Sequence, residues 1–138
     1  MGSRYRIPVA ISVQNTNNEE KPVLPRHERL RRRKDFLACY QEGKVYAQAH
    51  LVLYVRPQAS GRRFGFVVGK KVGKAVVRNR VKRRLRAACR ECLPNLSDGF
   101  DAVFVARKNA AEADYHQLLR EMQSLFQSAK VWKVSAEP

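Results

Sequence analysis

The sequence predicts a single-domain α+β fold, a two-layer sandwich in which helices cover one small sheet. Apolar residues recur with the period of a helix in three segments, 31–42, 76–93 and 114–127. Apolar or alternating runs that are typical of strands occupy 51–56, 64–68 and 100–107. The resulting order of helix, strands, helix, strand and helix favours an α+β sandwich. The length of 138 residues suits one domain.

The first helix is predicted over 31–42 and ends at Gly43. Phe36 and Tyr40 are four residues apart, so both rings lie on one helix face. Aromatic side chains at this spacing most often belong to a core. Unpaired nucleotides also stack on such rings, and both interpretations stay open here.

The first predicted strand stops at Pro57. Its period of two divides the side chains between two faces, with Leu51, Leu53 and Val55 on one and Val52, Tyr54 and Arg56 on the other. Because Tyr54 shares its face with Arg56, we expect that face to be partly open. Residues 58–63 are predicted to form a hairpin loop around Gly61 that returns as the strand 64–68.

The second helix is predicted over 76–93 and is stopped by Pro94. An apolar stripe within one arc should face the sheet: Val77, Val81, Leu85, Ala88, Cys89 and Cys92. Cys89 and Cys92 form a Cys-x-x-Cys motif, but a zinc site needs about four ligands and no second pair exists. We therefore expect these cysteines to be buried and structural.

A strand over 100–107 and a helix over 114–127 complete the pattern, and Asp114 with Gln117 resembles a capping box. We expect a domain over 23–130 and a C-terminal tail over 131–138. Residues 1–22 are interpreted as a flexible N-terminal extension or a remnant of an expression vector.

The cations are concentrated in two segments. The net charge is +16; Arg26 to Lys34 contains six Lys and Arg residues, and Lys70 to Arg90 contains ten with no acid. Charge runs are usually solvated faces, but nothing in the second segment offsets the mutual repulsion of its cations. A polyanion would relieve that repulsion and release counterions, so the segment predicts nucleic-acid binding.

An anionic membrane is the alternative partner. No apolar run approaches the ~20 residues that a membrane-spanning helix needs, and no secretory signal is visible. We therefore expect no membrane partner and a cytoplasmic protein, in which Cys39, Cys89 and Cys92 stay reduced.

No catalytic constellation is apparent in the sequence. His27, His50 and His116 fall in three separate segments, without an adjoining nucleophile or a cluster of carboxylates. We expect no catalytic residue in this chain, and the sequence assigns no metal position.

The segment KKVGKAVVRNRVKRRLR, from Lys70 to Arg86, resembles the RNR signature of the bacterial ribonuclease P protein family. Further matches are Arg29-Leu30, Asp35-Phe36 and Tyr40, the strand Leu51 to Tyr54, and Ala106-Arg107-Lys108. The resemblance extends from about Leu24 to Phe126. At Tyr40 the family often places Phe.

The resemblance implies an αβββαβα order with a left-handed βαβ crossover, which the usual right-handed rule would exclude. It also implies that an RNA subunit performs Mg²⁺-dependent removal of the 5′ leader of precursor tRNA. The chain itself would bind that RNA subunit and precursor tRNA, with no cofactor of its own. The basic motif would contact RNA through Lys70, Lys71, Lys74, Arg78, Asn79, Arg80, Lys82, Arg83, Arg86 and Arg90. A leader-binding cleft would contain Phe36, Tyr40, Tyr54 and Arg56.

Three other functions share part of this pattern. A basic ribosomal protein or RNA chaperone would have the charge but does not require the signature. A DNA-binding regulator would need a helix where the strand 64–68 stands, so no DNA partner is expected. A stand-alone nuclease would need an acid cluster to hold metal.

Overall fold

The computed structural model describes residues 24–59 and 61–133, so the predicted extension at 1–22 lies outside the described residues. The helices are α1 (Arg33–Glu42), α2 (Ala75–Cys92) and α3 (Tyr115–Ser128), and the strands are β1 (Lys44–Ala47), β2 (Leu51–Pro57), β3 (Arg62–Val67) and β4 (Phe100–Ala106). Short 3₁₀ turns add η1 (Arg26–Glu28), η2 (Lys70–Val72), η3 (Leu93–Asn95) and η4 (Ala110–Glu112). The predicted α+β class and αβββαβα order are confirmed.

The four strands form one sheet in the order β1-β2-β4-β3. β4 pairs antiparallel with β2 and parallel with β3, so it lies between two strands that precede it in the chain. The predicted hairpin between β2 and β3 is therefore wrong, and Arg62 and Arg63 belong to β3 rather than to a loop. The backbone groups of β2 that a hairpin would pair with β3 pair instead with β4.

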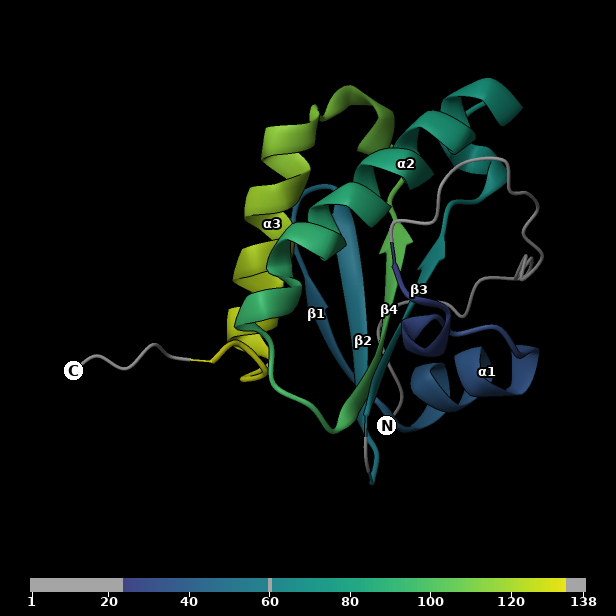
Figure 1. Ribbon diagram of the computed structural model, residues 1–138. Coiled ribbons are helices and arrows are strands. Elements are labelled where there is room, and N and C mark those ends of the chain that lie inside the picture. Colours follow the sequence, from purple (N-terminus) through teal and green to yellow (C-terminus); the bar gives the residue numbers. More distant parts are fainter. Residues whose placement is uncertain (1–23, 60, 134–138) are drawn as a thin grey trace.

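The connection from β3 through α2 to β4 is a left-handed crossover. In Figure 1 both strands point upward, α2 crosses in front of the sheet, and β4 lies to the left of β3. A right-handed crossover seen from this side would place the second strand to the right of the first. The handedness implied by the family resemblance is thus confirmed.

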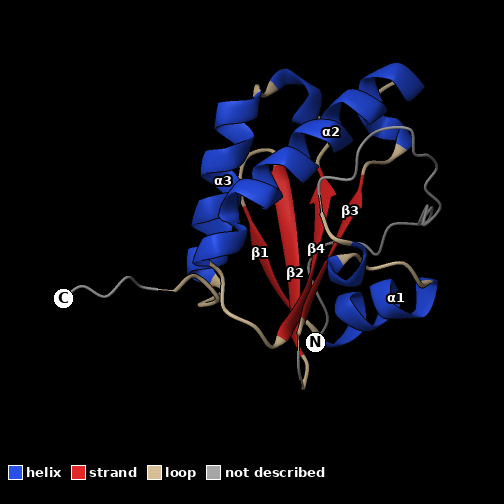
Figure 2. Ribbon diagram, viewed as in Figure 1, coloured by secondary structure: helices blue, strands red, loops and turns tan. Residues whose placement is uncertain are grey.

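Helices cover both faces of the sheet (Figure 2). α2 and α3 pack on the face that carries Leu53 and Phe104, in a core that also contains Leu85, Met122 and Phe126. α1 packs on the opposite face, where Val52 and Tyr54 of β2 point. The two faces of β2 divide as predicted, but α1 adds a third layer to the expected two-layer sandwich.

The layer between α1 and the sheet is a small aromatic core. Phe36, Tyr40 and Tyr54 are only 3%, 4% and 1% exposed. The rings of Tyr40 and Tyr54 meet edge to face with centroids 4.8 Å apart. Gly65 of β3 permits this packing, because a Cβ atom there would stand 2.5 Å from the Phe36 ring. The expectation of a partly open face at Tyr54 is wrong, since α1 covers it.

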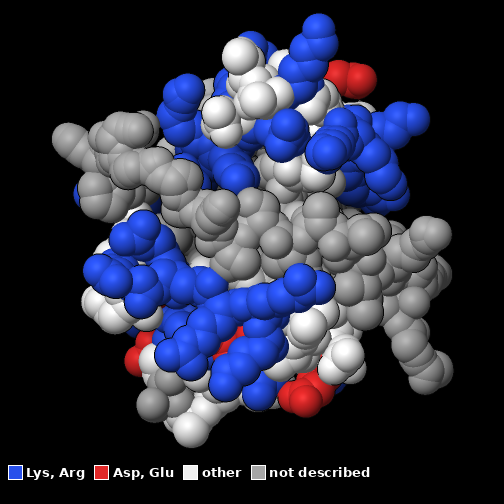
Figure 3. All heavy atoms as spheres, turned by 90° about the vertical axis from the view of Figure 1, so that its right-hand side faces the viewer, with Lys and Arg blue, Asp and Glu red and all other residues white. Residues whose placement is uncertain are grey.

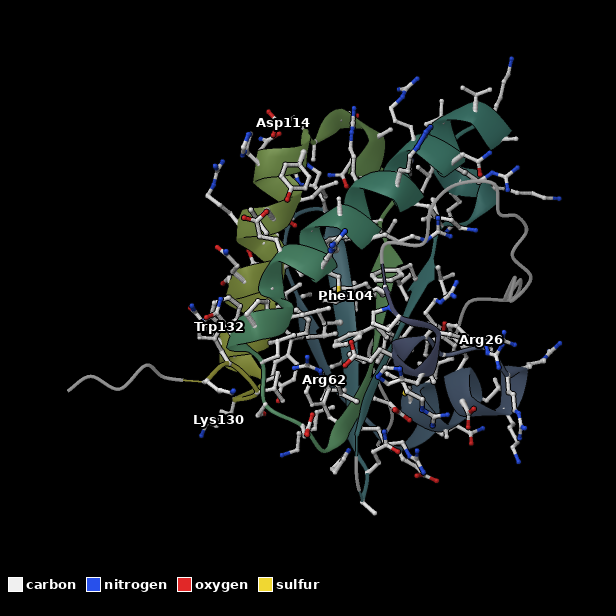
Figure 4. The ribbon with its side chains drawn as sticks, in the orientation of Figure 1. Arg26, Arg62, Phe104, Asp114, Lys130 and Trp132 are labelled. Carbon is white, nitrogen blue, oxygen red and sulfur yellow. The ribbon has the colours of Figure 1, made fainter. Side chains whose placement is uncertain are left out.

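The residues that follow α3 return to the domain. Lys130 adopts φ 62°, the left-handed conformation that ends many helices, and directs the chain toward η3. Trp132 forms a β-bridge with Leu96, and Val131 is buried. Figure 4 shows Lys130 and Trp132 beside the lower end of α3. Residues 131–133, which we expected in the tail, therefore belong to the folded domain.

Candidate nucleic-acid interface

The predicted RNA-contact residues lie on η2, on the outer side of α2 and between them. The core side of α2 is occupied by Val81, Leu85, Ala88, Cys89 and Cys92, as its apolar stripe predicts. The side chains that turn away from the sheet are exposed: Lys70, Lys71, Lys74, Asn79, Arg80, Arg83 and Arg90. Arg78, Lys82 and Arg86 are half-buried along one flank. All ten residues thus reach the surface from one continuous segment.

The half-buried flank places three cations at successive turns of α2. Residues four apart on a helix are neighbours, and like charges at this spacing destabilise it. The pKa of Lys82 is lowered from its usual value by burial and, to a smaller extent, by Arg86 and Arg78. An anion bound against this flank would oppose both effects on Lys82.

A second basic group lies at the start of α1. Arg26, Arg31, Arg32, Arg33 and Lys34 are all exposed. Figure 3 shows Lys and Arg gathered on one face of the molecule in an upper group over η2 and α2 and a lower group over α1. The sequence marked this segment as a charge run, and that signal could have placed these residues among the predicted contacts.

Of the described α2 and η2 cations other than Arg86, none has a carboxylate partner. The nearest side-chain bonds are to backbone oxygens, from Arg78 Nε to Gly73 at 3.1 Å and from Arg84 Nη1 to Ala113 at 2.8 Å. The described ion pairs of Arg and Lys involve residues at the other end of the sheet, Arg56, Arg62 and Arg63. Most of the positive charge on α2 is therefore available to an external anion.

The predicted leader-binding cleft requires a correction. Stacking on nucleotides needs an open ring face, whereas the rings of Phe36, Tyr40 and Tyr54 are enclosed between α1 and the sheet. Arg56 is engaged as well, because its Nε donates to Glu42 Oε1 at 2.9 Å and its Nη1 lies 3.6 Å from Asp101 Oδ2. The bond to Glu42 raises the pKa of Arg56. The three rings therefore form a structural layer rather than a stacking surface, whereas Arg56 keeps 28% of its side chain exposed and its place in a leader-binding site stays a prediction.

The cysteine thiols of the described chain are enclosed. Burial raises the pKa of the Cys39 and Cys92 thiols to about 12 and raises that of Cys89 as well. All three cysteines are free, buried thiols, in agreement with the structural role that the helix pattern favours. His50 Nδ1 lies 2.6 Å from Glu121 Oε2 and ties the β1–β2 turn to α3.

Within residues 24–59 and 61–133, no group of three or more His, Cys, Asp or Glu side chains could hold a metal ion. No helix in the same ranges has the length and apolar character needed to cross a membrane.

Fold and surface together define a small basic α+β protein whose candidate site is an array of cations on one helix and the turn before it. Residues 24–130 match the family model for Ribonuclease P. The ribonuclease P protein component of Cyanothece sp. is 39% identical over 127 residues, covering 79% of this chain and 97% of the relative. That of Microcystis aeruginosa is 43% identical over 114 residues, covering 78% and 95%. The chain belongs to the ribonuclease P protein family.

Solved structures of two relatives have the same fold. The RNase P protein of Staphylococcus aureus aligns with a TM-score of 0.70 at 27% identity, over 77% of this chain and 98% of that chain. The RNase P protein of Thermotoga maritima aligns with a TM-score of 0.67 at 34% identity, over 73% and 96%.

Proposed function

We propose that this chain is the protein subunit of a ribonuclease P, which binds the catalytic RNA subunit and the 5′ leader of precursor tRNA. The observation that carries the proposal is the surface of η2 and α2. Between Lys70 and Arg90 the chain carries ten cations and no acid, on η2, at the start of α2 and on the sides of α2 that its apolar core stripe leaves free. Phosphates neutralise such an array and release its counterions.

The leader contact is assigned to the basic group at the start of α1. The aromatic rings that the sequence offered for this role are buried, whereas Arg31 to Lys34 are exposed. Exposed cations bind phosphates whatever the base sequence, so we expect these residues to contact the sugar–phosphate backbone of the leader rather than particular bases.

The chemistry in this proposal belongs to the RNA and its Mg²⁺ ions. The described residues contain no group of three or more His, Cys, Asp or Glu side chains that could hold a metal ion, and we assign no metal to this chain. The protein contributes positive potential, which lowers the repulsion between the phosphates of the two RNAs.

The test compares two double variants that each remove two positive charges. Arg80→Ala with Arg83→Ala lies on the outer face of α2, and the control, Arg120→Ala with Lys133→Ala, removes exposed cations on and after α3. Affinity for ribonuclease P RNA is measured across salt concentrations. The α2 variant should bind more weakly and lower the salt slope by about 1–2, at roughly one unit per lost phosphate contact. Equal effects of the two variants would contradict the proposal.

The same variants are then assayed for cleavage of precursor tRNA with the RNA subunit at low Mg²⁺. The wild-type chain should accelerate leader removal, and the chain without RNA should be inactive. High Mg²⁺ should partly replace the protein, because added divalent ions screen the same phosphates. Cleavage by the protein alone would contradict the assignment of chemistry to the RNA.

A further inference from the structure

One carboxylate is enclosed in the sheet beneath α1. Asp101 of β4 has 0% of its surface exposed and is the only buried charged residue in the described ranges. Its direct neighbours across the sheet are Arg56 of β2 and Arg63 of β3. Arg63 binds it twice, from Nη2 to Oδ2 at 2.9 Å and from Nε to Oδ1 at 3.1 Å. Gln58 Nε2 donates to Oδ1 at 2.7 Å.

The two arginines extend this contact to both ends of α1. Arg63 Nη1 lies 3.3 Å from Oδ2 of Asp35, in the first turn of the helix. Arg56 Nε lies 2.9 Å from Oε1 of Glu42, the last residue of the helix. The chain of ion pairs Asp35–Arg63–Asp101–Arg56–Glu42 thus joins α1 at both ends to three strands.

Arg62, the residue before Arg63 in β3, connects the other face of the sheet to the segment after α2 and to η1. Arg62 Nη1 donates to the carbonyl oxygens of Leu93 at 3.1 Å and Leu96 at 2.8 Å, beyond the end of α2. Its Nε donates to Glu28 in η1 at 3.0 Å. Figure 4 shows Arg62 beside the lower part of the sheet, on the side of the segment that follows α2. Two consecutive arginines therefore tie the first basic segment and the end of α2 to one strand.

Apolar packing alone would hold α1 against the sheet but would not strongly fix the orientation of the helix axis on the sheet. The bidentate pair with Asp101 fixes the Arg63 guanidinium on the sheet, and one ion pair from Arg63 and one from Arg56 then reach the two ends of α1. Two such contacts at opposite ends of a helix can specify one arrangement among several. The four cations from Arg31 to Lys34 are carried by the end of α1 that Asp35 anchors.

We propose that Asp101 is a positioning residue for RNA binding, which holds α1 so that its cations stand at a fixed place relative to those of α2. This inference rests on the proposed function, since it assumes that both basic groups contact RNA. Asp101 itself touches no RNA and acts through Arg63 and Arg56.

The sign of one substitution separates positioning from bulk charge. Asp101→Asn raises the net charge by one, so bulk electrostatics would strengthen binding to a polyanion. A positioning role predicts the opposite, a loss of about tenfold in affinity for ribonuclease P RNA with precursor tRNA, as small misplacements of binding groups produce. Glu112→Gln removes an exposed acid of η4 and serves as the matched control, with affinity unchanged or slightly higher. Affinity is measured at a temperature at which circular dichroism shows both variants folded.

A double-mutant cycle then tests how the loss arises. If Asp101 acts through the α1 cations, Asp101→Asn should cost little further affinity in the background Arg33→Ala with Lys34→Ala. In the background Arg80→Ala with Arg83→Ala its effect should remain in full. Contacting or coupled groups deviate from additivity, and independent ones do not. Full additivity in both backgrounds would overturn the proposal, as would tighter binding by the single variant.

A second variant covers the case in which Asp101→Asn does not fold. Asp35→Asn with Glu42→Gln keeps both arginine contacts to Asp101 and releases only α1. It should also weaken binding, although it removes two acids, and unchanged or stronger binding would overturn the proposal. If Arg80→Ala with Arg83→Ala leaves the affinity unchanged, the proposed function fails; if that variant weakens binding and the cycle shows no coupling, only the role of Asp101 fails.

Discussion

The hydroxyl group of Tyr40 is enclosed without a hydrogen-bond partner among the described residues. Its ring is well packed against Tyr54, and burial raises the pKa of Tyr40 above its usual value. A buried hydroxyl that loses its water contacts and gains none destabilises the folded state. The ring of Tyr40 therefore stabilises the fold, whereas its hydroxyl group destabilises it.

Tyr40→Phe should raise the free energy of unfolding by about 1 kcal/mol, because it removes only the unpaired hydroxyl. Urea denaturation of the two proteins measures the difference. Tyr115→Phe is the control, since the Tyr115 hydroxyl donates to Glu91 at 2.8 Å and its loss should bring no gain. A Tyr40→Phe variant less stable than wild type would show that the hydroxyl is bonded in solution.

Gly65→Ala should destabilise the protein by about 1–3 kcal/mol, the usual cost of overfilling a packed core. The added methyl group would meet the Phe36 ring at 2.5 Å and push α1 from the sheet. Gly69→Ala provides the comparison, because a Cβ atom there meets nothing within 4 Å. Thermal unfolding of both variants checks the difference, and equal melting temperatures would mean that α1 moves without resistance.

For the helices and strands, the sequence predicts the features that depend on neighbouring residues, such as helix caps and apolar stripes. It misses the pairing of strands that lie far apart in the chain. The capping box of Asp114 and Gln117 is present in both directions at 2.9 Å, and the apolar stripe of α2 faces the core as predicted. The residue pattern does not reveal β1, because its four residues are too few to show the alternation of apolar and polar side chains that is typical of a strand. The predicted pairing of β2 with β3 is wrong because β3 pairs with β4, a strand that begins only after α2.

The burial of the aromatic layer is indicated by the composition of β2. Residues 51–55 are apolar without interruption, and a strand with apolar side chains on both faces is typical of a sheet covered on both sides. That pattern predicts a helix over the face that carries Tyr54. Since α2 and α3 cover the other face, this helix is α1. The interpretation of Arg56 as a sign of an open face overlooked Glu42 and Asp101 as partners, which no local pattern reveals.

Asp114→Ala should cost about 1 kcal/mol of stability, since it leaves the amide group of Gln117 without its acceptor at the start of α3. Asp114→Ser, which keeps an acceptor at the same position, should lose much less. Both free energies of unfolding are obtained from denaturant titrations. A loss of the same size in Asp114→Ser would indicate a role for the charge rather than for the cap.

The net charge of +16 destabilises the folded protein through repulsion among its cations and favours its complex with RNA. The free protein should therefore become more stable as salt rises, because screening reduces repulsion among the cations of α2. Its affinity for RNA should fall over the same range. Melting temperatures and binding isotherms between about 50 and 500 mM salt test the two opposite slopes. A melting temperature that falls with screening salt would contradict the description of α2 as a helix under repulsion.

The insertion of β4 between β2 and β3 has a consequence for the order in which the protein is made. A ribosome releases both basic segments and three of the four strands before β4, the strand that joins β2 to β3, emerges. Until then β2 and β3 have no common neighbour, and long-range pairing of this kind forms slowly. A nascent chain that has emerged as far as Pro94 thus displays the cations of α1 and α2 before β4 has joined β2 and β3 in one sheet. RNA that reaches this chain early would meet the charges before β4 supplies Asp101 to orient them.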